Sequence, residues 1–249
     1  MVARIQLEFG ASGARRLALA ALTGADERFA EDADTLLRRL AIAGTDCVHG
    51  EALTLLTIGD RDRALAGLYA SLYGPAIIAD TVCGRCKAPY EMRFDLSALV
   101  KARQPDGSAR GDPPTVTLGK SVLRLPRRAD LVGMPEDLPE RLLLEGPVPD
   151  LATVSAIFEA ADPALELDLS GACPECDASQ AVAFSMARFL ERALERDRAF
   201  LTREVHLIAS GYRWSHAEIL ALTRAERQGF ARLLIAEREA ASAPMRRVS

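Results

Sequence analysis

Two Cys-x-x-Cys pairs constrain the fold of this chain of 249 residues more than any other sequence feature. The pairs are Cys83 with Cys86 and Cys173 with Cys176, far apart along the sequence. In a reducing compartment, paired cysteines of this kind are typical metal ligands. Structural zinc takes four ligands at tetrahedral corners, and one Cys-x-x-Cys turn supplies two of them. The spacing therefore predicts one structural Zn²⁺ held by all four thiolates.

The segments on both sides of each pair predict two β-hairpins. Tyr90, Met92 and Phe94 alternate with charged residues after the first pair. Residues 164–172 alternate in the same way before the second pair. A period of two is typical of half-buried strands. We expect the two hairpins to pack together as a zinc-ribbon-like element with the metal between their tips.

A redox dithiol and ordinary buried thiols are the alternative explanations of these cysteines. A thioredoxin-type motif lies at the strand-to-helix junction of a βαβ unit, and neither pair has those flanks. The fifth cysteine, Cys47, is interpreted as a small buried hydrophobic residue, since only His49 lies near it in the sequence. A compact zinc ribbon has an insert of roughly 15–20 residues between its pairs. The much longer insert here must form a subdomain.

The rest of the chain favours helices, because Ala, Leu and Arg are abundant and rank high in helix propensity. Asp60 and Asp62, like Glu31 and Asp32, are interpreted as capping or solvated residues. Helices are predicted over 33–42, from Thr57 to Gly74, over 151–161, over 184–212 as one or two helices, and over 215–222 and 223–241, with a small hairpin over 115–126.

We expect an α+β fold that is mostly helical, with two β-hairpins forming the zinc-ribbon-like element and an inserted subdomain. The predicted regions are a mostly helical N-terminal region (1–74), the split hairpins (75–102 and 163–186), the inserted subdomain (103–162) and a C-terminal helical region (187–249).

Composition and motifs restrict the classes of function that this chain can have. The formal net charge of −4 argues against a protein whose main task is to bind nucleic acid. Nucleophile-elbow, phosphate-loop and His-Glu-x-x-His motifs are absent from the sequence, and a Cys₄ zinc leaves no open position for a catalytic water. We therefore expect no enzymatic activity and no small-molecule substrate. The sequence shows neither a secretory signal nor a bilayer-spanning stretch, so we expect a cytoplasmic protein without a membrane partner.

Three blocks occur in the same order as in a group of baseplate proteins from contractile phage tails and related contractile injection systems. The first is LTIGDRDR at 56–63, followed by a helix that ends with LYG at 72–74. The second is the Cys83–Cys86 hairpin with FDL after it at 94–96. The third runs from REVHL at 203–207 to YRWS at 212–215, with EIL at 218–220. The chain resembles this group in these blocks.

The resemblance implies a structural or assembly component of the baseplate, with other baseplate or tail proteins as partners. It implies a location in the cytoplasm during assembly and, where the protein is retained, in the phage-tail or injection-system particle. The alternative is a zinc-ribbon module that binds nucleic acid or serves transcription, for which the charges of Arg85, Lys87, Glu175 and Asp177 are the discriminating feature. A zinc-dependent enzyme is a third interpretation, and it requires a coordination position on the metal that is open to water or substrate.

Overall fold

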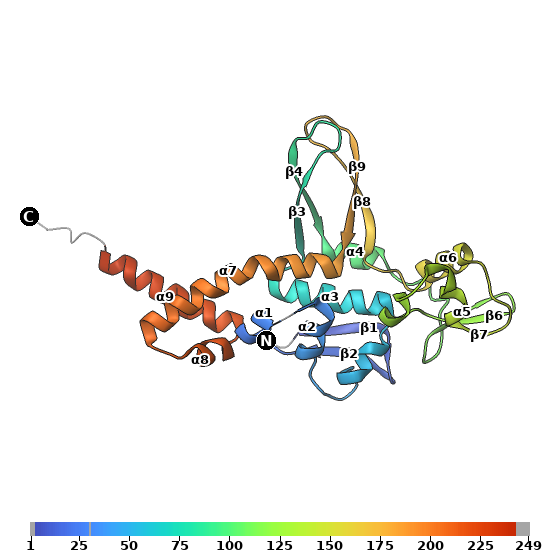
Figure 1. The fold of residues 1–249 in the computed structure, drawn as a ribbon, viewed down its shortest axis with the longest axis horizontal. Coiled ribbons are helices and arrows are strands. Elements are labelled where there is room, and N and C mark those ends of the chain that lie inside the picture. Colours follow the sequence, from blue (N-terminus) through green and yellow to red (C-terminus); the bar gives the residue numbers. More distant parts are fainter. Residues whose placement is uncertain (1–2, 30, 243–249) are drawn as a thin grey trace, which may run out of the picture. The chain divides into compact units, whose positions relative to one another are not determined.

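A computed structural model of the chain describes residues 3–29 and 31–242 and shows an α+β fold (Figure 1). The chain divides into two compact units. One unit comprises Ala20–Leu40 and the residues from Glu191 onward, and the other comprises Val2–Leu19 and Ala41–Leu190. We call them the helical unit and the hairpin unit. The parts of the predicted regions that cover residues 1–2, 30 and 243–249 lie outside the described residues.

The hairpin unit holds nine strands, which form two-stranded and three-stranded sheets within the described residues. Its strands are β1 (Ala3–Ala11), β2 (Ala14–Leu19), β3 (Ala76–Val82), β4 (Pro89–Asp95), β5 (Thr115–Leu118), β6 (Ser121–Arg124), β7 (Leu143–Glu145), β8 (Glu166–Ala172) and β9 (Ser179–Ser185). Its helices are α3 (Ile58–Tyr73), α4 (Leu96–Ala102), α5 (Leu138–Leu142) and α6 (Leu151–Ala161), with three 3₁₀ helices, η1 (Gly50–Leu55), η2 (Arg128–Leu131) and η3 (Pro135–Asp137).

Helix α3 forms the centre of the hairpin unit, and its prediction from sequence is confirmed. Thr57 is the N-cap, and its side chain accepts a hydrogen bond from the backbone N–H of Asp60. Gly74 ends the helix with a φ of 83°, a conformation that favours glycine. Leu65 and Leu68 are fully buried and Tyr69 nearly so, which places the apolar face of the helix in the core.

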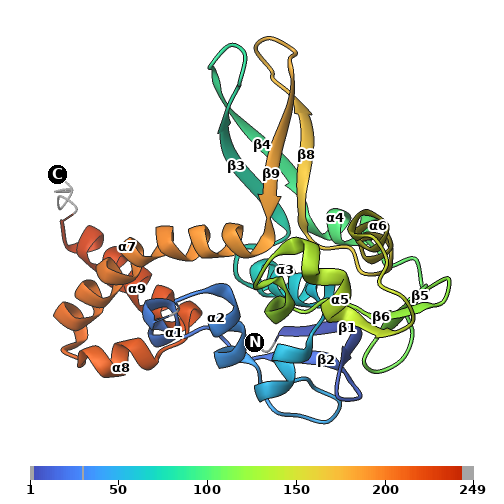
Figure 2. The same cartoon turned by 45° about the vertical axis from the view of Figure 1, so that its right-hand side comes forward.

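Two antiparallel strand pairs flank the cysteines. Strand β3 pairs with β4 from Ala76↔Asp95 to Val82↔Pro89, and β8 pairs with β9 from Glu166↔Ser185 to Ala172↔Ser179. The two pairs lie side by side in both views (Figures 1 and 2). The rings of Phe94 and Phe184 meet edge to face, with their centroids 5.2 Å apart. Such an aromatic contact stabilises the packing of one pair on the other.

The N-terminal segment differs from its prediction. Residues 3–19 form the antiparallel pair β1–β2, so the prediction of a mostly helical region over 1–74 is wrong there. Ile5, Leu7 and Phe9 alternate with Arg4, Gln6 and Glu8, which is the period of a strand. Gly10, near the end of β1, has a φ of 70°. Burial of Leu7, Leu17 and Leu19 overrides the helix propensity of this Ala- and Arg-rich segment.

The insert between the two hairpins has a hydrophobic core cluster of its own. Strands β5, β6 and β7 form a three-stranded sheet, and the predicted hairpin over 115–126 is confirmed as β5–β6. The cluster contains the buried residues Ala109, Val116, Leu123, Leu125, Leu142, Val154, Phe158 and Ala161. Helix α6 supplies three of them, and its N-cap is Asp150, whose side chain accepts a hydrogen bond from the Thr153 N–H. The region boundaries given above stay predictions.

The helical unit contains α1 (Gly24–Phe29), α2 (Ala33–Leu40), α8 (His216–Ala221), α9 (Arg224–Ser242) and the greater part of α7 (Met186–Tyr212). Helix α7 is one continuous helix, where the sequence left one or two open. The predicted helix over 215–222 is confirmed as α8, and Ser215 and Glu218 form a capping box at its start. Tyr212 and Trp214 stack with their ring centroids 5.2 Å apart, and Phe230 meets both edge to face. Trp214 is thus half-buried against α9.

Candidate metal centre

The four predicted cysteines lie together at the tips of the two hairpins. Their sulfur atoms are all within 4.8 Å of one another. The shortest described separations join the two hairpins: Cys83 Sγ lies 3.7 Å from Cys176 Sγ, and Cys86 Sγ lies 3.7 Å from Cys173 Sγ. These distances are far longer than the roughly 2.05 Å of a disulfide, and all four cysteines are free thiols.

The sulfur separations suit a tetrahedral metal ion. A Zn–S bond of about 2.3 Å places neighbouring sulfurs at tetrahedral corners about 3.8 Å apart. The observed 3.7 Å agrees with that edge. Within residues 3–29 and 31–242, no other group of three or more His, Cys, Asp or Glu side chains has a geometry suited to one metal ion. The four cysteines are therefore the candidate metal centre.

The two Cys-x-x-Cys turns have the same backbone conformation. In the first, the Cys83 N–H donates to the Ala88 carbonyl and the Lys87 N–H to the Cys83 carbonyl. In the second, Cys173, Ala178 and Asp177 make the equivalent two bonds. Lys87 and Asp177 both adopt positive φ, 62° and 53°. The first cysteine of each turn is fully buried, whereas Cys86 is exposed and Cys176 half-buried.

Backbone N–H groups aim at the sulfur of Cys83. The Cys86 N–H has the largest effect and lowers the pKa of the Cys83 thiol to about 6, against desolvation, which raises it. The Arg85 N–H lies 3.3 Å from the same sulfur and lowers the pKa further. A thiol with such a pKa is ionised at neutral pH, and the thiolate is the form that binds metal.

A second polar cluster lies at the first turn of α3, where the sequence analysis predicted only capping or solvated carboxylates. That interpretation is correct for Asp32, which caps α2 by accepting from the Thr35 N–H, and wrong for Asp60 and Asp62. Asp60 is fully buried and accepts from the backbone N–H groups of three β1 residues. The donors are Glu8, Phe9 and Gly10, at 2.7, 2.8 and 2.7 Å.

Asp62 and Asp162 extend this cluster to the segment that enters β8. Asp62 accepts from the Leu165 N–H at 2.8 Å, and Asp162 accepts from the Gly59 N–H at 2.8 Å. The buried guanidinium of Arg63 donates to Asp162 at 3.1 Å. Burial raises the pKa of both carboxyls, that of Asp62 to about 6. These bonds connect the first turn of α3 with the segment that enters β8.

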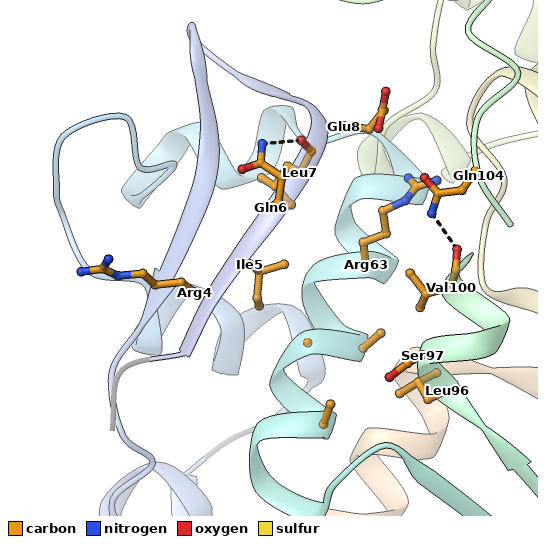
Figure 3. A pocket seen from close by; sticks show the side chains of 13 residues that line it. Arg4, Ile5, Gln6, Leu7, Glu8, Arg63, Leu96, Ser97, Val100 and Gln104 are labelled. Carbon is orange, nitrogen blue, oxygen red and sulfur yellow. Dashed lines mark hydrogen bonds between the residues drawn. The ribbon is translucent and has the colours of Figure 1, made fainter. Parts of the chain in front are cut away.

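A cavity of about 450 Å³ lies between β1, α3 and α4 (Figure 3). Small and aliphatic residues make most of its wall, among them Ile5, Ala66 and Val100. The amides of Gln6 and Gln104 donate to backbone carbonyls beside the cavity. None of the described residues that line it is His, Cys, Asp, Lys or Tyr. Its lining includes one carboxylate, that of Glu8, and one hydroxyl, that of Ser97.

The remaining predicted residues stand apart from the sulfur cluster. Cys47 is half-buried rather than buried, and its N–H donates to the Gly44 carbonyl. His49 is exposed, and its Nδ1 lies 2.9 Å from the Cys47 carbonyl oxygen. Neither residue joins the metal-binding group within the described chain. Of the helices in the described residues, every one is too short or too polar to cross a membrane.

Comparison with protein-family models, with curated proteins and with solved structures finds no match to this chain. The resemblance to baseplate proteins therefore rests on the three sequence blocks alone.

Proposed function

We propose that this chain is a structural or assembly protein whose two hairpins are joined by one structural zinc ion into a zinc-ribbon-like element. The observation that carries the proposal is the closed set of four cysteine sulfurs at the hairpin tips, with 3.7 Å edges between the hairpins. Four thiolates fill the tetrahedral coordination of zinc and leave no position for a reacting water. A metal held in this way stiffens the protein and offers no site for turnover.

The energetics favour such a role. Closing a long loop costs conformational entropy that grows only slowly with its length, by about 0.6 kcal/mol for each doubling. Structural zinc contributes apparent binding free energies of about 10–16 kcal/mol in zinc-finger peptides. The metal term exceeds the added cost of the long insert. One ion is therefore sufficient to hold together hairpins that are distant in the sequence.

We further propose that the protein belongs to the baseplate of a contractile phage tail or contractile injection system, with other baseplate or tail proteins as partners. The three ordered sequence blocks support this assignment. The test is affinity capture of the tagged full-length chain from cells that assemble such particles. Tail or baseplate proteins should be recovered with it, and its deletion should reduce the yield of complete particles. Normal particles after deletion would contradict the assignment.

The nucleic-acid alternative finds less support at the metal centre. Arg85 and Lys87 make the first turn basic, but Glu175 and Asp177 make the second turn acidic, and all four are exposed. A phosphate backbone would meet repulsion from the second turn. Tight DNA or RNA binding with a steep salt dependence would favour this alternative over the assembly role.

Replacing a buried ligand tests the metal assignment. Cys83→Ser or Cys173→Ser should release the metal and lower the free energy of unfolding by several kcal/mol, because the zinc contribution is lost. Cys47→Ser is the matched control, since this thiol lies outside the cluster and the variant should keep its metal. Metal content measured by elemental analysis and thermal unfolding report the outcome. Unchanged metal content in both ligand variants would remove the assignment.

A further inference from the structure

The two hairpins are structurally equivalent, and each position in the second follows its counterpart in the first by 90 residues (Cys83 and Cys173, Cys86 and Cys176). The same offset relates their backbone hydrogen bonds and their positive-φ residues. The two short sulfur separations are also equivalent: replacing each cysteine by its counterpart converts the Cys83–Cys176 distance into the Cys173–Cys86 distance, and both are 3.7 Å. The tip of the hairpins is thus approximately two-fold symmetric.

Residues related by this two-fold symmetry carry opposite charges at the tip. Arg85 in the first turn is equivalent to Glu175 in the second, and Lys87 is equivalent to Asp177. All four side chains are exposed. Lys87 Nζ donates to the Gly84 carbonyl of its own turn at 2.8 Å. Among the described residues, no ion pair involves any of the four, so their charge is available to a partner.

From this reversal we infer that the hairpin tip is a self-complementary contact surface for a second copy of this chain. A two-fold axis across the tip places the basic turn of one copy opposite the acidic turn of the other. The reverse pairing arises at the same time, because a two-fold interface uses the same patch on both subunits. A partner of one charge sign would be repelled by one of the two turns, whereas a second copy matches both.

Size follows the same complementarity as charge. Val82 is 59% exposed beside the basic turn, and its equivalent beside the acidic turn is the smaller Ala172, also exposed. Gly84 in the basic turn corresponds to Pro174 in the acidic turn. The larger side chain of each pair therefore meets the smaller one in the two-fold arrangement. Exposed ion pairs are individually weak, so the association is expected to be reversible and sensitive to salt.

Charge-reversal variants of the full-length, zinc-loaded protein test the inference in sedimentation experiments over a range of concentrations. The wild-type protein should associate at about 0.01 M salt and dissociate at about 1 M salt. Arg85→Glu/Lys87→Glu makes the whole tip acidic, and Glu175→Lys/Asp177→Lys makes it basic. Each variant alone should remain monomeric. An equimolar mixture should form a heterodimer at least about ten-fold tighter than either self-association.

Lys101→Glu/Lys120→Glu is the matched control, because it reverses two exposed lysines away from the tip and should self-associate as the wild type does. Metal content and circular dichroism establish that each variant is folded. A wild-type protein that stays monomeric at low salt, or a mixture that forms no heterodimer, would overturn the inference. Metal binding is measured separately, so failure here leaves the zinc assignment standing.

Discussion

Three buried carboxylates, Asp60, Asp62 and Asp162, lie around the first turn of α3 with the buried guanidinium of Arg63. A buried charge is costly unless it is paired and hydrogen-bonded. Asp60 meets that condition through three backbone N–H groups, which a neutral side chain of the same size could not satisfy together. Its carboxylate fixes the irregular part of β1, where the register shifts between Gln6 and Ala11.

Because of Asp62, the free energy of unfolding should decrease as the pH rises from acidic to neutral values. Desolvation raises its pKa from 3.8 to about 6, so the folded protein binds a proton that the unfolded chain releases. The stabilisation from this proton is complete below pH 3.8 and is lost as the pH rises through about 6. Asp62→Asn should therefore gain about 2 kcal/mol relative to the wild type between pH 4 and pH 7, at about 1.4 kcal/mol for each pKa unit, because part of the shift takes effect outside this pH range.

Urea unfolding at a series of pH values measures this difference. Asp80→Asn, which removes an exposed carboxylate of β3, controls for the change in net charge. A constant difference in unfolding free energy between Asp62→Asn and the wild type from pH 4 to pH 7 would contradict the prediction.

At the scale of elements, the helices and strands with local sequence signals could be predicted. Helix α6 lies at Leu151–Ala161 as predicted, because caps, periodicity and flanking turns are local signals. The cysteine cluster was predictable because ligand type and spacing define a metal site. The pair β1–β2 was missed although Ile5, Leu7 and Phe9 alternate, since abundant Ala and Arg suggested a helix.

The carboxylate cluster at α3 could not be predicted from the sequence. The donors to Asp60 lie 50–52 residues before it, and the donor to Asp62 lies 103 residues after it. Backbone N–H groups carry no side-chain identity, so no residue type marks them as partners. Tertiary packing alone brings them together.

Two helical glycines should respond oppositely to a methyl group. A Cβ on Gly59 in α3 would overlap the carboxylate of Asp162, whereas a Cβ on Gly229 in α9 meets nothing within 4 Å. Gly59→Ala should lower the unfolding free energy by about 1–3 kcal/mol through overpacking. Gly229→Ala should raise it by about 0.5–1 kcal/mol, because alanine loses less backbone entropy in a helix.

Urea unfolding followed by circular dichroism compares the two glycine variants directly. Each serves as the control for the other, since the substitution is the same at both positions. Stabilisation by Gly59→Ala would show that Asp162 does not occupy the space beside Gly59.

At the scale of the whole molecule, the metal centre belongs to one of two compact units. All four cysteines and both hairpins lie in the hairpin unit, and the helical unit holds its own cluster around Ile208, Ile219 and Leu234. Metal removal should therefore affect the two units unequally. The hairpin tips depend on the ion because two-stranded sheets are only marginally stable in isolation.

Chelation followed by hydrogen exchange tests this division. Backbone amides of residues 76–95 and 166–185 should lose protection when zinc is removed, because the hairpins open locally. Amides of α9 should keep their protection, and they act as the internal control. Equal loss of protection in both parts would show that the ion stabilises the entire chain.

The long separation between the two cysteine pairs also determines when the metal site can form during translation. Cys83 and Cys86 leave the ribosome before Cys173 and Cys176, and equivalent cysteines are 90 positions apart in the sequence. At roughly 5–20 residues per second, the first two thiols wait about 5–20 s for their partners. During that interval the nascent chain carries half of a metal site, and the donor of the Asp62 hydrogen bond, Leu165, has not yet been made. The hairpin unit thus completes its folding only after most of the chain has been translated.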